Sequence, residues 1–292
     1  MTSLKERFQV SRPNPCILSF SSQVVSGHVG NSAAQFAMQR LGFEVLAVPT
    51  IVLGHHKGHE REPHQWLIDA KTLAGLADDA EAAMGASTRA VLSGYGGSVG
   101  ALIAIADHVR RLKAAHPELI YLCDPVLGDH GRLYVDPPVA EAIGRHLAAQ
   151  ADILTPNLFE LGWLTGTAPQ DIDAAVSAAR SLDIERVLVT SAPSDAPGEM
   201  VNLLVSRSET VLARTPRLDN PPHGTGDLIA ALFLARILQG HDGGEALGLA
   251  AASVHDVLEM STEISSDELA LVAAQEALIA PKTRIICETR RG

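Results

Sequence analysis

Apolar strand-like runs alternate with helical segments through most of this 292-residue chain, and this alternation limits the possible folds more than any other feature. The runs lie at residues 16–20, 44–49, 89–92, 119–123, 152–154 and 186–189. Consecutive parallel strands need a crossover connection, which is usually a helix. The pattern therefore predicts an α/β fold with a mostly parallel central sheet and helices on both faces.

The segments between these runs are predicted as helices and loops. Helices are expected at residues 32–41, 66–84, 99–115, 138–149, 157–165 and 170–182. Residues 21–31 and 50–62 contain small, polar and glycine residues and are predicted as loops. Pro49 is expected to end the strand before the second loop, because proline cannot donate to a strand ladder.

The rest of the chain supplies a flap, a hairpin and a helical end. Residues 130–135 are predicted to form a short hairpin or flap. Residues 201–206 and 210–213 are predicted to form a terminal hairpin, and the remainder after Asp227 is predicted to be helical.

Composition bounds the class of protein. Hydrophobic residues make up 46% and charged residues 20%, which is an ordinary globular mixture. No internal repeat or linker divides the chain, so a polar leader at residues 1–15 and a single domain at residues 16–292 are expected.

Charge and cysteine content exclude several partners. A formal net charge of −11 disfavours a phosphate-backbone partner, so no nucleic acid is expected. No apolar run approaches the length of a membrane span. Cys16, Cys123 and Cys287 are odd in number and widely spaced, as in buried thiols of a reducing compartment. These features predict a soluble cytoplasmic protein without a membrane partner.

A glycine-flanked loop runs directly into an apolar segment near residue 225. The sequence Gly224-Thr225-Gly226-Asp227 precedes a run with almost no polar face, as expected of a tight loop that opens a buried helix. The first amides of a helix lack internal partners and carry partial positive charge, so this loop could hold a phosphate. Asp227 would then accept a proton from an attacking hydroxyl, or it would only cap the helix.

Polar residues follow the predicted strands or begin the next helix. They are Ser22, Thr50, Tyr95, Asp124, Asn157, Glu160, Thr190 and Asp227. In open parallel sheets ligands bind outside the carboxyl ends of the strands, so these side chains are expected at one edge and at one site.

Other motifs do not support a competing site. The chain contains no GxxxxGK[ST] phosphate loop. Gly94, Gly96 and Gly100 do not make a dinucleotide fingerprint, because Val99 takes the place of the third glycine. Histidines at positions 55, 56, 59 and 64 fall in a glycine-containing loop with basic neighbours, which predicts a solvated loop or lid rather than a metal site.

Several motifs together resemble the pyridoxal kinase family of the ribokinase-like superfamily. Gly-Thr-Gly-Asp at residues 224–227 is similar to the superfamily motif. The sequences Gly-His-Val-Gly-Asn at 27–31 and Cys-Asp-Pro-Val-Leu-Gly-Asp at 123–129 point more narrowly to pyridoxal kinases. Further matches are Ser-Gly-Tyr at 93–95, Thr-Pro-Asn at 155–157 and Val-Thr-Ser at 189–191.

The resemblance implies an activity. Members use ATP with a divalent metal such as Mg²⁺, and often a monovalent cation such as K⁺, to phosphorylate the 5′-hydroxymethyl group of B6 vitamers. It implies a homodimer with small-molecule partners. Asp227 resembles the catalytic base, and the amides of Gly224, Thr225 and Gly226 resemble the anion hole.

The resemblance also implies the remaining site residues. Substrate-binding positions match Ser22, Thr50 and Tyr95, together with Asp227. Positions around ATP match Asp124, Asn157, Glu160, Thr190, Ser191 and, in the flap, Tyr134. Metal-binding positions match Asp124, Thr155 and Glu160.

Two departures leave the substrate open. Gln23 stands where many members have histidine, and Ile51-Val52-Leu53 replaces a stretch that carries an amide and an aromatic residue. A hydroxymethylpyrimidine kinase of the same fold and a non-catalytic vitamer-binding protein are therefore kept as alternatives.

Overall fold

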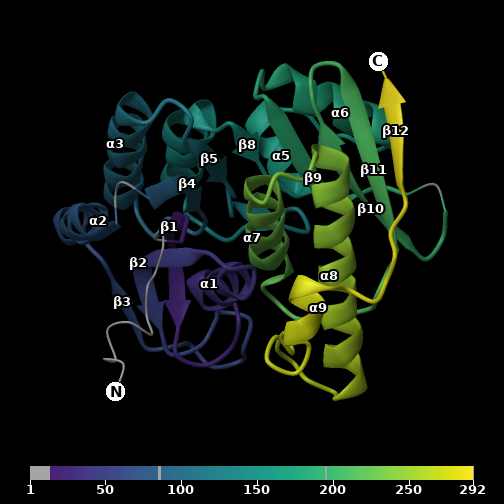
Figure 1. Ribbon diagram of the computed structural model, residues 1–292, viewed down its shortest axis with the longest axis horizontal. Coiled ribbons are helices and arrows are strands. Elements are labelled where there is room, and N and C mark those ends of the chain that lie inside the picture. Colours follow the sequence, from purple (N-terminus) through teal and green to yellow (C-terminus); the bar gives the residue numbers. More distant parts are fainter. Residues whose placement is uncertain (1–13, 85–86, 195, 292) are drawn as a thin grey trace, which may run out of the picture.

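A ten-stranded sheet forms the centre of the molecule in the computed structural model, which describes residues 14–84, 87–194 and 196–291 (Figure 1). The expected leader therefore lies almost wholly outside the described residues. The strand order is β12-β11-β10-β9-β8-β5-β4-β1-β2-β3. The six strands in the middle of this order pair in parallel, which confirms the predicted architecture. They are β1 (Cys16–Val24), β2 (Glu44–Leu53), β4 (Thr88–Ser93), β5 (Ile120–Cys123), β8 (Ile153–Leu154) and β9 (Arg186–Ala192).

Helices cover both faces of this sheet. On the face toward the viewer in Figure 1 lie α1 (Asn31–Arg40), α7 (Thr225–Leu238), α8 (Gly243–Glu263) and α9 (Gln275–Ile279). The other face packs against α2 (Ala70–Met84), α3 (Val99–Ala115), α4 (Pro137–Ala142) and α6 (Ile172–Ser181), with α5 (Leu158–Thr165) beside them. After α4 the chain continues as a short π-helix at Ile143–Leu147 and a 3-10 helix at Ala148–Gln150.

Alternation along each strand divides the core into two layers. Ile17 of β1 and Leu122 of β5 belong to the layer under α7 and α8, whereas Leu18 and Tyr121 belong to the layer under α3. Successive side chains in a strand point to opposite faces, so nearly continuous apolar strands bury both faces at once. This explains why these strands lack the polar alternation of a half-exposed sheet.

Antiparallel strands extend the sheet at both ends. At one end lie β10 (Glu199–Val205), β11 (Glu209–Pro216) and β12 (Cys287–Arg291). The hairpin of β10 and β11 was predicted, but it is not terminal, because β12 returns from the end of the chain to pair with β11. The prediction that the remainder after Asp227 is helical is therefore wrong for β12, whose largely charged sequence suits an exposed edge strand.

The first two strands are longer than predicted. β1 includes Ser21 and Ser22, and β2 runs through Pro49 to Leu53. Proline is tolerated in β2 because the outer neighbour β3 (Gln65–Leu67) pairs only from Ile51 onward, so no ladder bond to β3 is lost at Pro49. β3 also corrects the predicted helix at 66–84, which begins only at Ala70.

The remaining loops mostly follow the expectations. A small hairpin of β6 (Gly128–Asp129) and β7 (Arg132–Leu133) forms where the flap was predicted. The histidine segment is a loop, but it is not fully solvated, since His56 is 8% exposed. Among the described residues no helix is long and apolar enough to cross a membrane.

Helix α7 is buried along nearly its whole length, so its packing sets much of the stability. Phe233 of α7 is fully buried, and Phe233→Ala should lower the free energy of unfolding by about 3–5 kcal/mol, because it leaves a cavity that the core cannot fill. Ile264→Ala is the control, since Ile264 is 53% exposed and should change stability by less than about 1 kcal/mol. Urea unfolding measures both, and equal effects would contradict this packing.

Candidate active site

The predicted polar residues lie largely at the carboxyl edge of the parallel strands. Ser22 is near the end of β1, Gly94 and Tyr95 follow β4, and Asp124 follows β5. Thr155 and Asn157 follow β8, and an isolated bridge places Asn157 beside Thr190 near the end of β9. The parallel register therefore brings distant parts of the sequence to one edge, as expected for an open α/β sheet.

Gly224 begins helix α7 in a left-handed conformation. Its φ is 93°, it occupies the N-cap position, and no side chain caps the helix. A Cβ at Gly224 would collide with the carbonyl oxygen of His28, so glycine is required for both conformation and space. Residues 224–226, called the anion loop below, thus present uncapped first-turn amides that favour an anion.

Asp227 is the third residue of α7, in its first turn, and is not its N-cap. The alternative that Asp227 is the N-cap is therefore wrong, although its carboxylate does accept from a backbone N–H of the first turn, its own. Burial raises the pKa of Asp227 to about 6, although the backbone N–H groups of Gly30 and of Asp227 itself favour the charged form. A carboxylate with a raised pKa at a loop of free amides is well suited to accept a proton.

The end of β4 approaches Asp227 closely. A Cβ placed on Gly94 would lie 3.8 Å from Asp227 Oδ1 and 2.6 Å from Ser21 Oγ. The hydroxyl of Ser21 is buried and has no hydrogen-bond partner in the described structure. Sequence analysis missed Ser21, because it treated this residue as part of a loop and selected its neighbour Ser22.

Ser22 lies under the turn that precedes α1. Gly30 has a φ of 54°, and a Cβ there would collide with both the hydroxyl and the carbonyl of Ser22. Ser22 is buried, and this close contact fixes the strand end against the Gly-His-Val-Gly-Asn turn. The side-chain amide of the neighbouring Gln23 donates to Ser32 Oγ at 2.7 Å, so this side chain points toward α1.

Thr50 and Tyr95 are joined to each other. The fully buried Thr50 donates its hydroxyl to the backbone carbonyl of Tyr95 at 2.6 Å. Tyr95 is half-buried and packs against a small apolar cluster of Val24, Ile51 and Leu53. Thr50 therefore positions the Tyr95 turn, and the ring of Tyr95 is the more accessible of the two groups.

Buried carboxylates meet at the same edge. Burial raises the pKa of Asp124 well above its usual range, and the charges of Glu160 and then Asp227 raise it further. Burial raises the pKa of Glu160 to about 7, against three backbone N–H groups that favour its charged form. Neighbouring buried acids that repel one another are typical of cation sites, because a bound metal ion offsets their negative charge.

Glu160 also braces the flap. Its Oε1 accepts from the backbone N–H groups of Leu127 at 2.7 Å and Gly128 at 3.3 Å, and its Oε2 accepts from Asn157 at 2.9 Å. In return, Asn157 Oδ1 accepts from the backbone N–H of Glu160 at 2.9 Å, and Asn157 Nδ2 donates to Gly128 O at 2.7 Å. This reciprocal capping box connects α5 rigidly to the strand that leads into the flap.

Not all predicted residues converge equally. Thr155 has a buried hydroxyl that lies close enough to the Asp124 carboxylate to favour its charged form. Ser191 has a φ of 55° and its hydroxyl donates to the sulfur of Met200 at 3.5 Å, so it faces β10 and not the carboxylates. Tyr134 is 50% exposed beyond the flap hairpin.

Val126 is a strained residue that sequence analysis missed. Its φ of 41° is a genuine outlier for a β-branched side chain, and it lies two residues after Asp124. Such strain persists where the surrounding structure determines it, and it occurs frequently at functional sites.

The donor set fits a magnesium ion. Asp124 and Glu160 offer hard carboxylate oxygens, and the buried hydroxyl of Thr155 lies beside the Asp124 carboxylate. Magnesium usually takes one or two carboxylates and keeps further positions for water or phosphate. These residues could therefore hold Mg²⁺ next to a phosphate on the anion loop.

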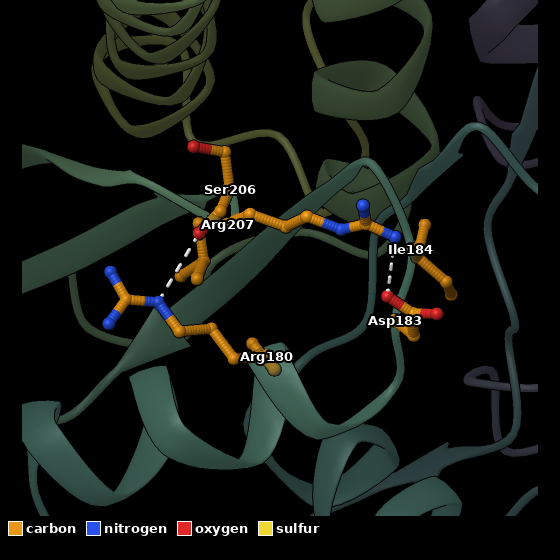
Figure 2. A pocket seen from close by; sticks show the side chains of 7 residues that line it. Arg180, Asp183, Ile184, Ser206 and Arg207 are labelled. Atoms are coloured by element: carbon orange, nitrogen blue, oxygen red, sulfur yellow. Dashed lines mark hydrogen bonds and ion pairs between the residues drawn. The ribbon is translucent and has the colours of Figure 1, made fainter. Parts of the chain in front are cut away.

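A separate small pocket lies at the opposite edge of the sheet (Figure 2). Its labelled residues come from the end of α6, the turn between α6 and β9, and the β10–β11 turn. Arg207 pairs with Asp183 at 2.7 Å, and Arg180 donates to Ser206 O at 3.2 Å. Because Asp183 precedes β9, this pocket is remote from the strand ends that carry the site.

Comparisons with known proteins agree with the geometry. Residues 89–271 match the sequence model of the phosphomethylpyrimidine kinase family. The chain is 38% identical to pyridoxal kinase PdxY of Leifsonia xyli subsp. xyli, covering 91% of this chain and 96% of that protein. It is 40% identical to pyridoxal kinase PdxY of Rubrobacter xylanophilus, with 92% and 95% covered.

A solved structure agrees as well. Pyridoxal kinase from Leishmania donovani, in complex with ADP and pyridoxamine, superposes with a TM-score of 0.88 at 27% identity. The match covers 95% of this chain and 100% of that one. The chain belongs to the pyridoxal kinase family and has the ribokinase-like fold, as the sequence motifs predicted.

The raised pKa of Asp227 has a consequence for stability. An acid whose pKa is higher in the folded than in the unfolded state makes the protein less stable as pH rises through the interval from about 4 to about 6. Asp227→Asn removes this effect and should raise the free energy of unfolding at pH 8 by about 1–2 kcal/mol. Urea unfolding at pH 4 and pH 8 measures it, and a variant less stable than wild type at pH 8 would contradict the assignment.

Proposed function

We propose that this member of the pyridoxal kinase family transfers the γ-phosphoryl group of ATP to the 5′-hydroxymethyl group of pyridoxal and related B6 vitamers. The products are pyridoxal 5′-phosphate and ADP. The observation that supports this most is Asp227, a carboxylate of raised pKa beside the uncapped amides of the anion loop.

Asp227 acts on the alcohol. A primary alcohol does not ionise at neutral pH, so the carboxylate orients the hydroxyl and accepts its proton as the new P–O bond forms. The Gly30 amide keeps Asp227 ionised and limits its orientation. The unpartnered hydroxyl of Ser21 lies beside Gly94, near Asp227, and Tyr95 follows Gly94 in the chain, so both residues suit contacts with a polar heteroaromatic substrate.

The anion loop acts on the phosphate. Negative charge moves among the phosphate oxygens during transfer, and preorganised amides stabilise it without rearranging. The amides of Gly224, Thr225 and Gly226 supply this stabilisation at the start of α7. No side chain competes for them, since the N-cap is glycine.

Asp124, Glu160 and Thr155 would hold Mg²⁺, with a monovalent cation such as K⁺ as a further requirement. When bound, the metal neutralises charge on the phosphates of ATP. Asn157 and Thr190 line the nucleotide side of the same edge, with Tyr134 in the flap above it. The hydroxyl of Ser191 donates to Met200 and its backbone N–H to Asn202 Oδ1, so Ser191 is left out of the proposed nucleotide contacts.

A hydroxymethylpyrimidine kinase is the second candidate. The matched family model carries the name phosphomethylpyrimidine kinase, and Val52 and Leu53 stand where the pyridoxal kinases commonly carry polar and aromatic groups. Both substrates are nitrogen heterocycles that carry a hydroxymethyl group, and in both reactions this group would lie at Asp227. They differ only in the ring that the pocket accepts.

A substrate panel separates the candidates. With Mg-ATP, a B6 vitamer should give a kcat/KM at least about tenfold above that of hydroxymethylpyrimidine. Asp227→Asn should lower kcat by about 10²–10⁴ while nucleotide binding changes little. Coupled ADP assays and nucleotide titration measure these quantities. Faster turnover of hydroxymethylpyrimidine would favour the second candidate, and vitamer binding without ADP release would indicate a non-catalytic binding protein.

We also propose a cytoplasmic homodimer. Val25, Trp66 and Leu67 are 81%, 68% and 47% exposed, and the last two lie on the edge strand β3. Exposed apolar groups on an edge strand are typical of an interaction surface.

Light scattering tests the dimer. The wild-type protein should have twice the mass of one chain, and Trp66→Glu should shift it toward the monomer because a charge would be buried in the interface. Trp163→Glu is the control, since Trp163 is also exposed, at 40%, but lies on α5. A monomeric wild-type protein would exclude the dimer.

A further inference from the structure

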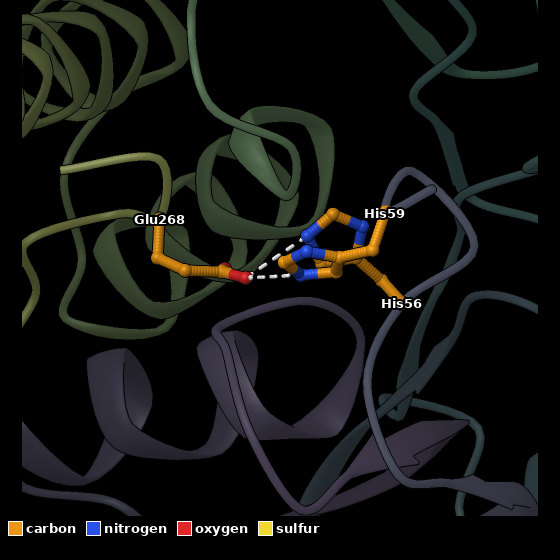
Figure 3. Close-up of side chains that lie close together, drawn as sticks. All are labelled: His56, His59 and Glu268. Atoms are coloured by element: carbon orange, nitrogen blue, oxygen red, sulfur yellow. Dashed lines mark hydrogen bonds and ion pairs between the residues drawn. The ribbon is translucent and has the colours of Figure 1, made fainter. Parts of the chain in front are cut away.

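Two histidines of one loop point at a single carboxylate from the far end of the chain (Figure 3). His56 Nε2 and His59 Nε2 lie 3.0 Å and 3.1 Å from Glu268 Oε1. Both histidines belong to residues 54–64, called the histidine loop below. The loop follows β2, whereas Glu268 follows α8, so more than two hundred residues separate the partners in sequence.

The same carboxylate holds a third segment. Its second oxygen, Oε2, accepts from the backbone N–H of His28 at 3.2 Å. The carboxylate also packs against Gly27, where a Cβ would lie 2.6 Å from Oε1. The carbonyl of His28 in turn packs against Gly224 of the anion loop. Glu268 thus joins the histidine loop to the 27–30 turn directly. It reaches the start of α7 through His28, whose carbonyl packs against Gly224.

The histidine loop also contacts the residue before the anion loop. The rings of His56 and His223 lie 4.8 Å apart, and a Cβ at Gly58 would collide with the ring of His223. His56 is buried, while most of the loop around it is exposed. Between its two ends, at Gly54 and the buried Pro63, the loop is attached to the rest of the molecule through the residues that meet Glu268 and His223.

Two imidazoles and a carboxylate are also a possible zinc donor set, but the hydrogen bonds oppose a metal. The backbone N–H of Gly58 donates to His56 Nδ1 at 3.0 Å, so that nitrogen carries a lone pair. Burial lowers the pKa of His56, which keeps its ring neutral, and the proton must then be on Nε2, facing Glu268. A metal would need the lone pair at Nε2, where this tautomer has none.

We infer that Glu268 is a positioning residue: its carboxylate, accepting hydrogen bonds from His56, His59 and the His28 amide, latches the histidine loop against the substrate side of the site. A carboxylate suits this role because it has only acceptor sites and can receive all three donors at once. An amide at the same position would turn an N–H toward at least one of them. The latch therefore depends on charge and not on shape alone.

Glu268→Gln tests the latch with two independent measurements. Lys57 and Arg61 are exposed within the histidine loop, so limited trypsin digestion reports its opening without any substrate. Cleavage at these residues should become about tenfold faster, because bonds to a charged acceptor are lost. The KM for the vitamer should rise about tenfold and kcat should change less, since the loop continues from β2, whose Thr50 holds the Tyr95 turn.

Matched variants distinguish the latch from general destabilisation. Glu276→Gln changes an exposed carboxylate paired with Arg40 and should leave both measurements at wild-type values. His59→Ala should accelerate cleavage, whereas His59→Gln should restore it toward wild type, because the glutamine amide can still donate to Glu268. This pair decides the question if Glu268→Gln does not fold.

Only the KM measurement rests on the proposed function, so the two can fail separately. Faster cleavage of Glu268→Gln, together with no turnover of any vitamer by the wild-type protein, would support the latch and refute the proposed reaction. Unchanged cleavage in both Glu268→Gln and His59→Ala would overturn the latch. Saturable binding of Zn²⁺ by the wild-type protein at micromolar concentration, lost in His59→Gln, would also overturn it in favour of a metal site.

Discussion

Buried negative charge facing unpaired backbone amides is the interaction on which the site depends. Asp124, Glu160 and Asp227 are all kept at raised pKa by burial, and the first feels the charges of the other two. The anion loop supplies partial positive charge close by. In the protein alone, neither the negative charge of these acids nor the partial positive charge of the anion loop is neutralised. A cation at the acids and a phosphate on the loop would neutralise both. In the proposed reaction, binding energy and catalysis would both come from this unneutralised charge.

Close backbone packing makes this arrangement possible. Gly224 admits the carbonyl of His28, and Gly30 admits Ser22, so the 27–30 turn lies directly between the first strand and the start of α7. The same turn supplies the Gly30 amide that acts on Asp227 and the His28 amide that Glu268 holds. One short turn thus connects Asp227, the anion loop and, through Glu268, the histidine loop, and the sheet supports all three.

The parallel sheet, most helices and the location of the site at the strand ends could be predicted, because they follow from local patterns. Apolar runs joined by helical segments allow few arrangements, and the glycines of residues 224–226 indicate their loop directly. The errors come from tertiary context. Ser21, Ser22 and Thr50 are polar residues that a buried strand tolerates near a ligand site, Pro49 is tolerated where β3 does not pair, and β12 has a charged sequence with no strand pattern. The partner of the histidine loop could not be found from sequence, since Glu268 lies on a distant segment and a lone glutamate carries no signal.

The central claim is that Asp227 and the anion loop meet the two reacting groups. A crystal structure with pyridoxal, Mg²⁺ and a non-hydrolysable ATP analogue tests it most directly. The account predicts the 5′ oxygen of the vitamer within about 2.6–3.2 Å of the Asp227 carboxylate, with the terminal phosphate on the amides of Gly224, Thr225 and Gly226. A vitamer bound with its hydroxymethyl group turned away from Asp227, or a terminal phosphate held elsewhere, would contradict it.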